Sequence, residues 1–233
     1  MTLPLLTLPL RAAPLATLII CTIVGGLAID RSFGVPGQIA VTLFVWVQLV
    51  WLCARADAAL RTRLIACVWI AGLGEIGASL LWRLYDYQFF NVPLFVPPGH
   101  ALLYLLGMLL AERLPPRVLS LVPWIAAPFV ALLAACGIDT LSLWLFALFV
   151  LFMCCGRDQP LYATMFVLAL VMEIIGTSIG NWHWPADVRL TSLTTLNPPL
   201  AAGVFYCVLD WLVSLRVRAA HWRMPSRSAA QPA

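Results

Sequence analysis

Apolar runs long enough to cross a membrane recur along almost the whole chain, and short polar segments separate them. A transmembrane helix needs about 20 consecutive, mostly apolar residues. The segments between the runs contain charged residues or prolines, which end helices. The pattern therefore predicts an all-α, polytopic integral membrane protein with eight spanning helices, over residues 12–29, 36–54, 64–82, 92–111, 118–138, 140–156, 161–182 and 198–215.

Two of these runs have an alternative interpretation. Only one charged residue, Arg11, precedes the first run, and no evident small-x-small cleavage motif is present. We therefore interpret this run as a retained helix rather than a cleaved signal peptide. The fourth run begins with Val92-Pro-Leu-Phe-Val-Pro-Pro98, for which an extended or re-entrant segment ahead of the helix is the alternative.

Composition narrows the class of protein further. Hydrophobic residues make up 63% of the 233 positions and charged residues only 10%, whereas a soluble domain carries about 25% charged residues. The seven cysteines lie in apolar runs without C-x-x-C spacing, which indicates packing residues rather than disulfides or metal ligands. We expect membrane lipids and an apolar small molecule as partners, with no nucleic acid, cofactor or metal.

The distribution of arginine predicts an orientation. All fourteen basic residues are Arg. With the N-terminus in the cytoplasm, eleven of them fall on the cytoplasmic side and three on the other side: Arg31, Arg83 and Arg189. The positive-inside rule then places both termini in the cytoplasm. We expect location in the cytoplasmic (inner) membrane of a bacterium, with a site that opens toward the periplasmic face.

An internal repeat relates the two halves of the chain. Gly77 and Gly176 are 99 residues apart, and the Pro-Pro pairs beginning at Pro97 and Pro198 are 101 residues apart. Four helices in each half is an even number, so the halves share one orientation and form the parallel type of repeat. The predicted units are a first half (1–114), a second half (115–216) and an Arg-rich, disordered cytoplasmic tail (217–233).

Glu75 and Glu173 are the strongest candidates for chemistry. Each lies inside an apolar run at a corresponding position of the repeat. A charged residue within the bilayer costs about 2.5–3.5 kcal/mol on insertion scales and therefore indicates function. Burial favours the neutral acid, so either residue is a candidate proton donor. The structural alternative is a protonated glutamate that only bonds to a neighbouring helix.

Two further ionisable residues lie in the apolar runs. His100 follows Pro97-Pro98-Gly99 near a helix N-terminus, where the dipole favours the neutral imidazole that can act as a base. The repeat places Ala201 at the equivalent position. Asp210 is interpreted as a structural acid, paired with Arg216 or Arg218.

Polar and aromatic residues around the two glutamates are candidates for lining a substrate site. Spacing of three and four residues places Ser79 and Trp82 on the face of Glu75, and Thr177 on the face of Glu173. The loops that follow are rich in aromatic residues, which form either an interfacial belt or the walls of a site. The candidates are Ser79, Trp82, Tyr85, Tyr87, Thr177, Trp182, His183 and Trp184.

Short motifs in both halves resemble a known family. In the first half these are Glu75-Ile-Gly77, Tyr85-Asp-Tyr87, and Asn91-Val-Pro-Leu94 with Pro97, which resemble a pattern of the membrane carotenoid hydratases of the bacterioruberin type. The segment from Glu173 to Gly180 resembles the same glutamate-glycine element. The chain departs from the family at Leu80-Leu-Trp-Arg83, where those proteins tend to have a Gly-Pro-aromatic-Gly turn.

The resemblance implies hydration of an isoprenoid double bond. Such a reaction needs an acid to protonate the alkene, groups that stabilise the tertiary cation, and a base to activate water. The resemblance assigns the acid to Glu75 or Glu173 and the base to His100, with Trp82, Tyr85 and Tyr87 around the cation.

Three functions remain open at this point. The first is a membrane enzyme that acts on an apolar isoprenoid or lipid substrate by acid–base chemistry such as hydration or isomerisation. The second is a small proton-coupled transporter, in which the same glutamates bind and release protons. The third is a non-catalytic assembly subunit, whose buried acids pair with partner helices.

Overall fold

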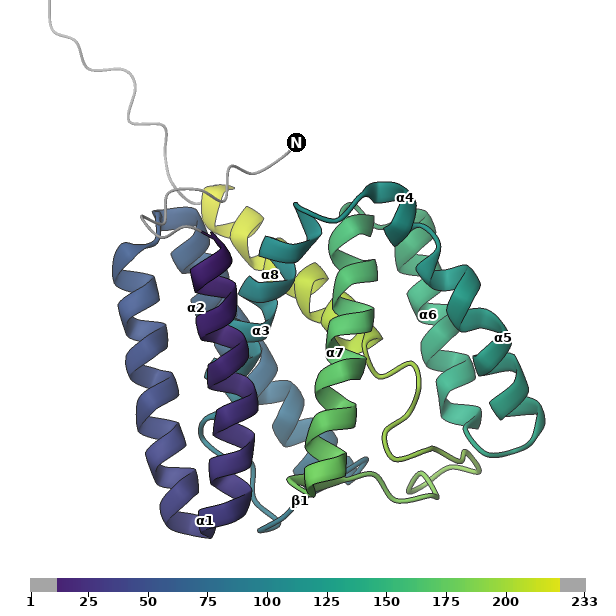
Figure 1. Ribbon diagram of the computed structural model, residues 1–233. Helices are drawn as coiled ribbons and strands as arrows, with labels where there is room; N and C mark the ends of the chain where they lie inside the picture. Colours follow the sequence, from purple (N-terminus) through teal and green to yellow (C-terminus); the bar gives the residue numbers. More distant parts are fainter. Residues whose placement is uncertain (1–11, 223–233) are drawn as a thin grey trace, which may run out of the picture.

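Residues 12–222 are described by the computed structural model, and they fold almost entirely into helices (Figure 1). The helices are α1 (Ala12–Arg55), α2 (Ala58–Glu75), the π-helix η1 (Ile76–Trp82), α3 (Val96–Ala111), α4 (Pro116–Leu119), α5 (Val122–Ala135), α6 (Thr140–Cys155), α7 (Gln159–Ile179) and α8 (Val204–Trp222). Two short strands, β1 (Asp86–Tyr87) and β2 (Trp182–His183), were not predicted. The prediction of a helical protein is confirmed.

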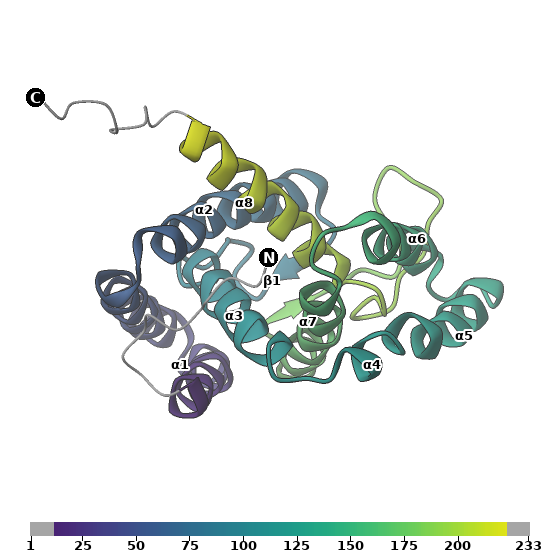
Figure 2. The same cartoon turned by 90° about the horizontal axis from the view of Figure 1, so that it is seen from above.

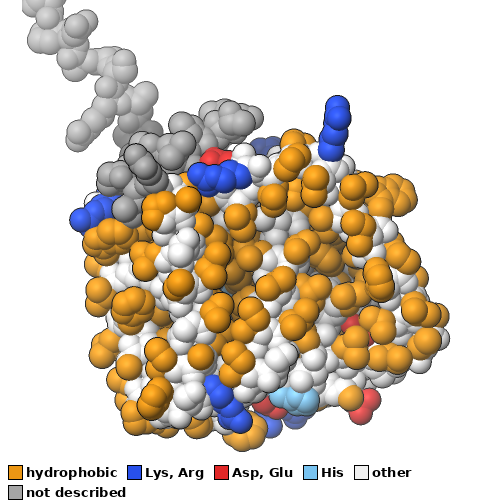
Figure 3. Space-filling model, viewed as in Figure 1, with side chains coloured by type: hydrophobic (Ala, Val, Ile, Leu, Met, Phe, Trp, Pro, Cys, Tyr) orange, Lys and Arg blue, Asp and Glu red, His pale blue; other side chains and the backbone are white. Residues whose placement is uncertain are grey.

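Four helical segments of the described chain are long and apolar enough to cross a membrane. They are Ala12–Arg55, Ala58–Trp82, Pro116–Ala135 and Gln159–Ile179. On the face shown in Figure 3, most charged side chains gather near the two ends of the molecule, with a broad apolar surface between them. Trp69, Leu81 and Trp124 are each more than 70% exposed, which suits contact with lipid chains rather than water.

α1 contains both of the first two predicted helices. Its path breaks at Gly34, where φ is 60° and ψ is −139°, a backbone conformation that glycine adopts at little cost. Two antiparallel limbs therefore lie side by side in Figures 1 and 2. Pro36 follows directly and suits the start of the second limb.

Several predicted boundaries are wrong, because local backbone geometry ends or delays the helices. α7 ends at Ile179, since Gly180 takes a left-handed conformation and caps it. α3 begins at Val96: Val92 and Pro93 lie outside any helix and Leu94 and Phe95 form a turn, whereas residues 96–98 of the alternative segment are helical. α8 begins at Val204 after turns over 200–203, and it continues to Trp222, so residues 217–222 are helical rather than part of a disordered tail. The rest of the predicted tail lies outside the described residues.

The short sheet joins loops that lie about a hundred residues apart. β1 follows η1 and pairs antiparallel with β2, which follows α7; Asp86 lies opposite His183, and Tyr87 opposite Trp182. Figure 1 shows this sheet at one end of the molecule, while α1 begins and α8 finishes at the other end. α8 packs against α2 as well as against α7, so the two predicted halves share one core.

Candidate functional site

A cavity of about 260 Å³ lies between α1, α2, α3, α7 and α8 and is closed at one side by the two strands. Most of its walls are apolar side chains of these helices. Its polar groups are contributed by Thr22, Glu75, Tyr85, Tyr87, His100, Glu173, Trp182, Trp184 and Tyr206. Since an engineered apolar cavity of about 150 Å³ binds benzene, this one has room for roughly ten carbon atoms.

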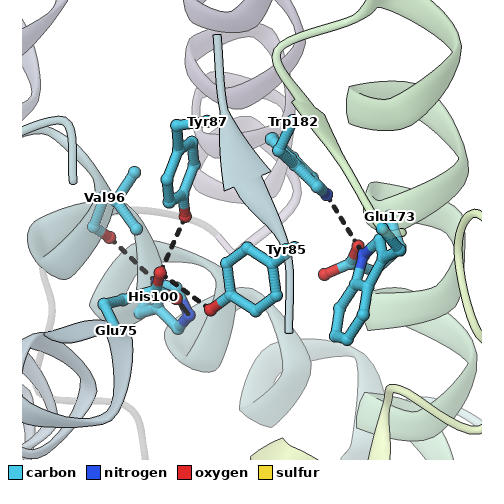
Figure 4. Close-up of polar contacts among 8 residues, drawn as sticks. Glu75, Tyr85, Tyr87, Val96, His100, Glu173 and Trp182 are labelled. Atoms are coloured by element: carbon cyan, nitrogen blue, oxygen red, sulfur yellow. Dashed lines mark hydrogen bonds and ion pairs between the residues drawn. The ribbon is translucent and has the colours of Figure 1, made fainter. Parts of the chain in front are cut away.

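Glu75 is buried at the end of α2 and accepts two hydrogen bonds through one oxygen. The hydroxyl of Tyr85 lies 2.9 Å from Oε2, and the hydroxyl of Tyr87 lies 2.8 Å from the same atom (Figure 4). Side chains two residues apart in an extended segment share a face, which explains why both phenols reach one carboxylate. η1 follows Glu75 directly, and π-helical turns occur frequently at functional sites.

Both phenols remain hydrogen-bond donors across the neutral pH range. Burial, and after it the negative charge of Glu75, raise the pKa of Tyr85 and of Tyr87 well above the usual value. A protonated phenol can donate its hydrogen to the carboxyl group and can also accept one. Two phenols that remain neutral therefore hold the Glu75 carboxyl group in place.

His100 reaches the other oxygen of Glu75. Its Nδ1 lies 3.0 Å from the carbonyl oxygen of Val96, one turn earlier in α3, and its Nε2 lies 3.2 Å from Glu75 Oε1. A carbonyl oxygen can only accept, so Nδ1 carries a hydrogen and Nε2 is the atom that changes protonation state. The ring also stacks on Tyr206, with centroids 5.4 Å apart.

The contact between Nε2 and Oε1 requires one shared proton. Either a protonated Glu75 donates to a neutral imidazole, or an imidazolium donates to the carboxylate. Both arrangements satisfy every partner that the structure provides, because Tyr85 and Tyr87 bond to the remaining oxygen. Glu75 and His100 therefore form a pair between whose atoms a proton can move without rearrangement of their neighbours.

Glu173 has a different set of partners. The indole Nε1 atoms of Trp182 and Trp184 donate to its Oε2 at 2.8 and 3.0 Å. Trp182 reaches it by packing on Gly176, where a Cβ atom would overlap the indole ring. The absence of a side chain at Gly176 thus leaves room for the Trp182 ring. Two N–H donors on one oxygen favour the carboxylate anion, whereas burial among apolar groups favours the neutral acid.

Aromatic rings connect the two glutamates across the sheet. Tyr85 lies between them in Figure 4, and its ring centroid is 4.6 Å from that of Trp184. Tyr87 and Trp182, which face each other across the strand pair, have centroids 5.9 Å apart. Glu75, Glu173, His100 and four of the predicted aromatic residues thus come together around one cavity.

Four predicted lining residues are not brought to this cavity. Trp82 is 41% exposed, and its indole donates to the carbonyl oxygen of Arg189. The Thr177 hydroxyl bonds to the backbone of its own helix at Glu173, and His183 is exposed beside Asn197. Ser79 is buried within η1 but outside the cavity lining. Ser79 and Trp82 were predicted to share the face of Glu75 from the spacing of an α-helix. They lie in a π-helix, whose turns are wider, so that spacing does not apply.

Asp210 does not pair with Arg216, and the side chain of the other predicted partner, Arg218, lies outside the described residues. Asp210 accepts a hydrogen bond from the Tyr104 hydroxyl, and its Oδ1 lies 3.8 Å from Nη1 of Arg63. Residues six apart do not share a helix face, so Arg216 points elsewhere while α2 and α3 supply the partners. This group joins three helices at a distance from the glutamates and fits the structural role that the sequence predicted.

Sequence reasoning missed a polar group that anchors the sheet to α1. Asp30 is 1% exposed and accepts hydrogen bonds from Asn181 and Gln88 at 2.8 Å each and from Gln38 at 3.3 Å. Gln88 and Asn181 adjoin β1 and β2, which carry Tyr87 and Trp182. In the sequence, Asp30 was interpreted only as a polar break between two apolar runs.

Comparison with protein-family models, with curated proteins and with solved structures finds no match to this chain. Among the side chains that the structure describes, residues 12–217, no three His, Cys, Asp or Glu come together as a possible metal-ligand set. Function must therefore be inferred from the geometry of the cavity and its polar groups.

Proposed function

We propose that the chain crosses the inner membrane eight times, with both termini in the cytoplasm and the strand pair near the periplasmic face. α1 would cross twice, once with each limb, the other three long helices would cross once each, and the shorter apolar helices α3 and α6 together with α8 would supply the remaining three crossings. The concentration of Arg at the end where α1 begins and α8 finishes supports this orientation.

A parallel repeat is supported by the chemistry of the two loops. In each half, a glutamate inside a helix accepts hydrogen bonds from two aromatic side chains that flank a single strand residue. These are Tyr85 and Tyr87 for Glu75, and Trp182 and Trp184 for Glu173. We propose that duplication of one four-helix unit produced both glutamate sites, which afterwards diverged in the identity of the aromatic groups.

We further propose that the protein is a membrane enzyme that performs acid–base chemistry on a double bond of an apolar isoprenoid or lipid. The observation that carries this proposal is the Glu75–His100 pair, which shares one proton at the wall of a mostly apolar cavity. An acid and a base in direct contact, inside an apolar site, are the groups that hydration or isomerisation requires.

Hydration would begin from neutral His100 and protonated Glu75. The hydrogen on Glu75 Oε1 moves to one alkene carbon, a C–H bond forms as the π bond breaks, and the other carbon becomes a tertiary cation. Water then attacks this cation and loses a proton to His100 Nε2. Transfer of that proton from Nε2 to Oε1, over 3.2 Å, restores the starting pair. The net change is addition of one water molecule.

Isomerisation would use the same first step. The cation then loses a proton from a neighbouring carbon to His100 Nε2 instead of gaining water, so the double bond moves along the chain. In both reactions the Glu173 carboxylate and the faces of Tyr85 and Trp184 stabilise the positive charge of the intermediate.

A proton-coupled transporter is the second candidate, and the same pair supports it. Ionisable residues inside a helix bundle also form proton pathways. The two functions differ in what they require: an enzyme changes the mass or structure of its substrate without a proton gradient, whereas a transporter moves its cargo only with one.

Comparison of extracted lipids would test the enzymatic proposal. Apolar lipids are extracted from cells that express the wild type or the Glu75→Gln/Glu173→Gln double variant, and from each purified protein, and are then analysed by mass spectrometry. We expect a lipid that gains the mass of one water, or changes its retention at constant mass, only with the wild type. Identical lipid profiles would overturn the enzyme and favour the transporter, which gradient-dependent flux would then test.

A further inference from the structure

The cavity adjoins a groove on the outer surface between α2 and α8. Ile70, Gly74 and Leu212 line both the cavity and this groove. The groove continues outward along Leu73, Leu215 and Arg216, and Leu73 is 68% exposed. α8 runs obliquely past α2 in Figures 1 and 2. A narrow boundary, made of Gly74 and the side chains of Ile70 and Leu212, thus separates the candidate site from the surface that faces lipid.

Gly74 is the weakest point of that boundary. It is exposed, and a Cβ atom built on it would meet no other atom within 4 Å. It also directly precedes Glu75, and neighbouring helix residues point about 100° apart. One residue therefore borders the groove while the next presents its carboxyl group to the cavity.

We propose that the substrate is a chain-like apolar molecule that reaches the cavity sideways from the bilayer, passing between α2 and α8 at Gly74. This inference rests on the proposed function, because it names the substrate class of the same site. The reacting segment occupies the cavity beside Glu75. The remainder of a longer molecule lies in the groove between Leu73 and Leu215 and extends into the lipid.

The arrangement explains how a cavity with room for roughly ten carbon atoms can serve larger molecules. A chain dissolved in the bilayer does not need to be enclosed along its whole length, nor to pass through water. Specificity then falls on the position of the double bond relative to the end of the chain, rather than on total length.

The test uses a conjugated polyene hydrocarbon as a probe, because it accepts excitation energy from Trp182 and Trp184 when it enters the cavity. The protein is reconstituted in phosphatidylcholine vesicles. The association rate is followed by the part of the tryptophan quenching that Trp184→Phe removes, because probe in the lipid also quenches the exposed Trp69 and Trp124. Gly74→Leu should fill the passage and slow association by roughly tenfold or more. Gly25→Leu is the matched control, because a Cβ there also meets nothing within 4 Å and Gly25 lines neither the cavity nor the groove.

A second variant tests the passage from the opposite helix. Leu212→Ala should widen it and speed association several-fold, so the proposal remains testable if Gly74→Leu does not fold. Wild-type association rates in Gly74→Leu or in Leu212→Ala would overturn the lateral passage, and so would absence of probe binding to the wild type.

Product formation separates this inference from the proposed function. Glu75→Gln should bind the probe at the wild-type rate but form no product from the natural lipid. If the wild type binds the probe as expected and converts no lipid, the enzyme proposal fails and the passage stands. If Gly74→Leu converts long lipids as fast as the wild type, the passage fails and the enzyme stands.

Discussion

The two glutamate sites have the same plan and opposite chemical capacities. Glu75 accepts from two phenols and contacts an imidazole, whereas Glu173 accepts from two indoles. A phenol or an imidazole can give up and take back a proton, but an indole N–H only donates. Under the proposed function, the difference corresponds to a division of labour, in which Glu75 transfers protons and Glu173 supplies negative charge to the intermediate.

Removal of the carboxyl groups one at a time should give the largest effect and should be unequal. Glu75→Gln removes the proposed acid and should lower kcat by about 10²–10⁴-fold, as for other general acids. Glu173→Gln keeps a hydrogen-bond acceptor for the indoles but removes the charge, so we expect a smaller loss of roughly 10–10²-fold. Measured turnover of the extracted substrate would test this, and equal losses would contradict the division of labour.

Replacement of His100, the proposed base, should have the next largest effect on turnover. His100→Gln can preserve the bond to the Val96 carbonyl but cannot accept the proton from water, so kcat should fall about 10²-fold while KM changes little. Ala201 is the position equivalent to His100 in the proposed repeat. Ala201→Gly provides the control, since it removes no ionisable group. A rise in KM with unchanged kcat would assign His100 to substrate binding instead.

Gly176 offers a way to disturb Glu173 without altering its charge. In Gly176→Ala the new methyl group must displace the Trp182 ring and lengthen its bond to the carboxylate. We expect loss of stability of about 1–3 kcal/mol from overpacking, with a several-fold fall in turnover. Gly77→Ala is the matched control, because a Cβ at Gly77 meets nothing within 4 Å. Thermal unfolding in detergent distinguishes the two, and equal midpoints would contradict the packing account.

The smallest effect at neutral pH is expected from the phenols, and it should grow in alkali. Because the folded state raises the pKa of Tyr85 and Tyr87, their contribution to stability is complete below the ordinary tyrosine pKa of about 10 and is lost as pH rises above it. The Tyr85→Phe/Tyr87→Phe variant should therefore lose stability less steeply than the wild type above that pH. Parallel stability curves, followed by unfolding at increasing pH, would contradict this expectation.

The ingredients of the site could be predicted from the sequence, but its assembly could not. Glu75 and Glu173 stand out because charged residues are rare in apolar runs, and the adjacent aromatic residues follow from their positions after these runs. Pairing of β1 with β2 brings Tyr87 and Trp182 together across 95 positions. No local pattern encodes that contact, since each strand has only two residues.

The structure differs from other sequence-based predictions where the backbone is not α-helical, or where the contact joins residues far apart in the chain. η1 has π-helical turns, so the spacing that predicted Ser79 and Trp82 as lining residues does not apply. Asp210 pairs with Arg63 because α2 and α8 pack together, a contact between residues far apart in the chain. Asp30 was overlooked for the same reason, since its partners lie on loops that only the folded protein brings to α1.

Infrared difference spectroscopy of the resting protein would test the division of labour most directly. Subtraction of the Glu75→Gln spectrum from the wild-type spectrum should reveal a protonated carboxylic acid band, which is the proton shared with His100. The same subtraction with Glu173→Gln should reveal an ionised carboxylate band and no acid band. An ionised Glu75 together with a protonated Glu173 would contradict the account, because the acid would then lie in the half that has no base.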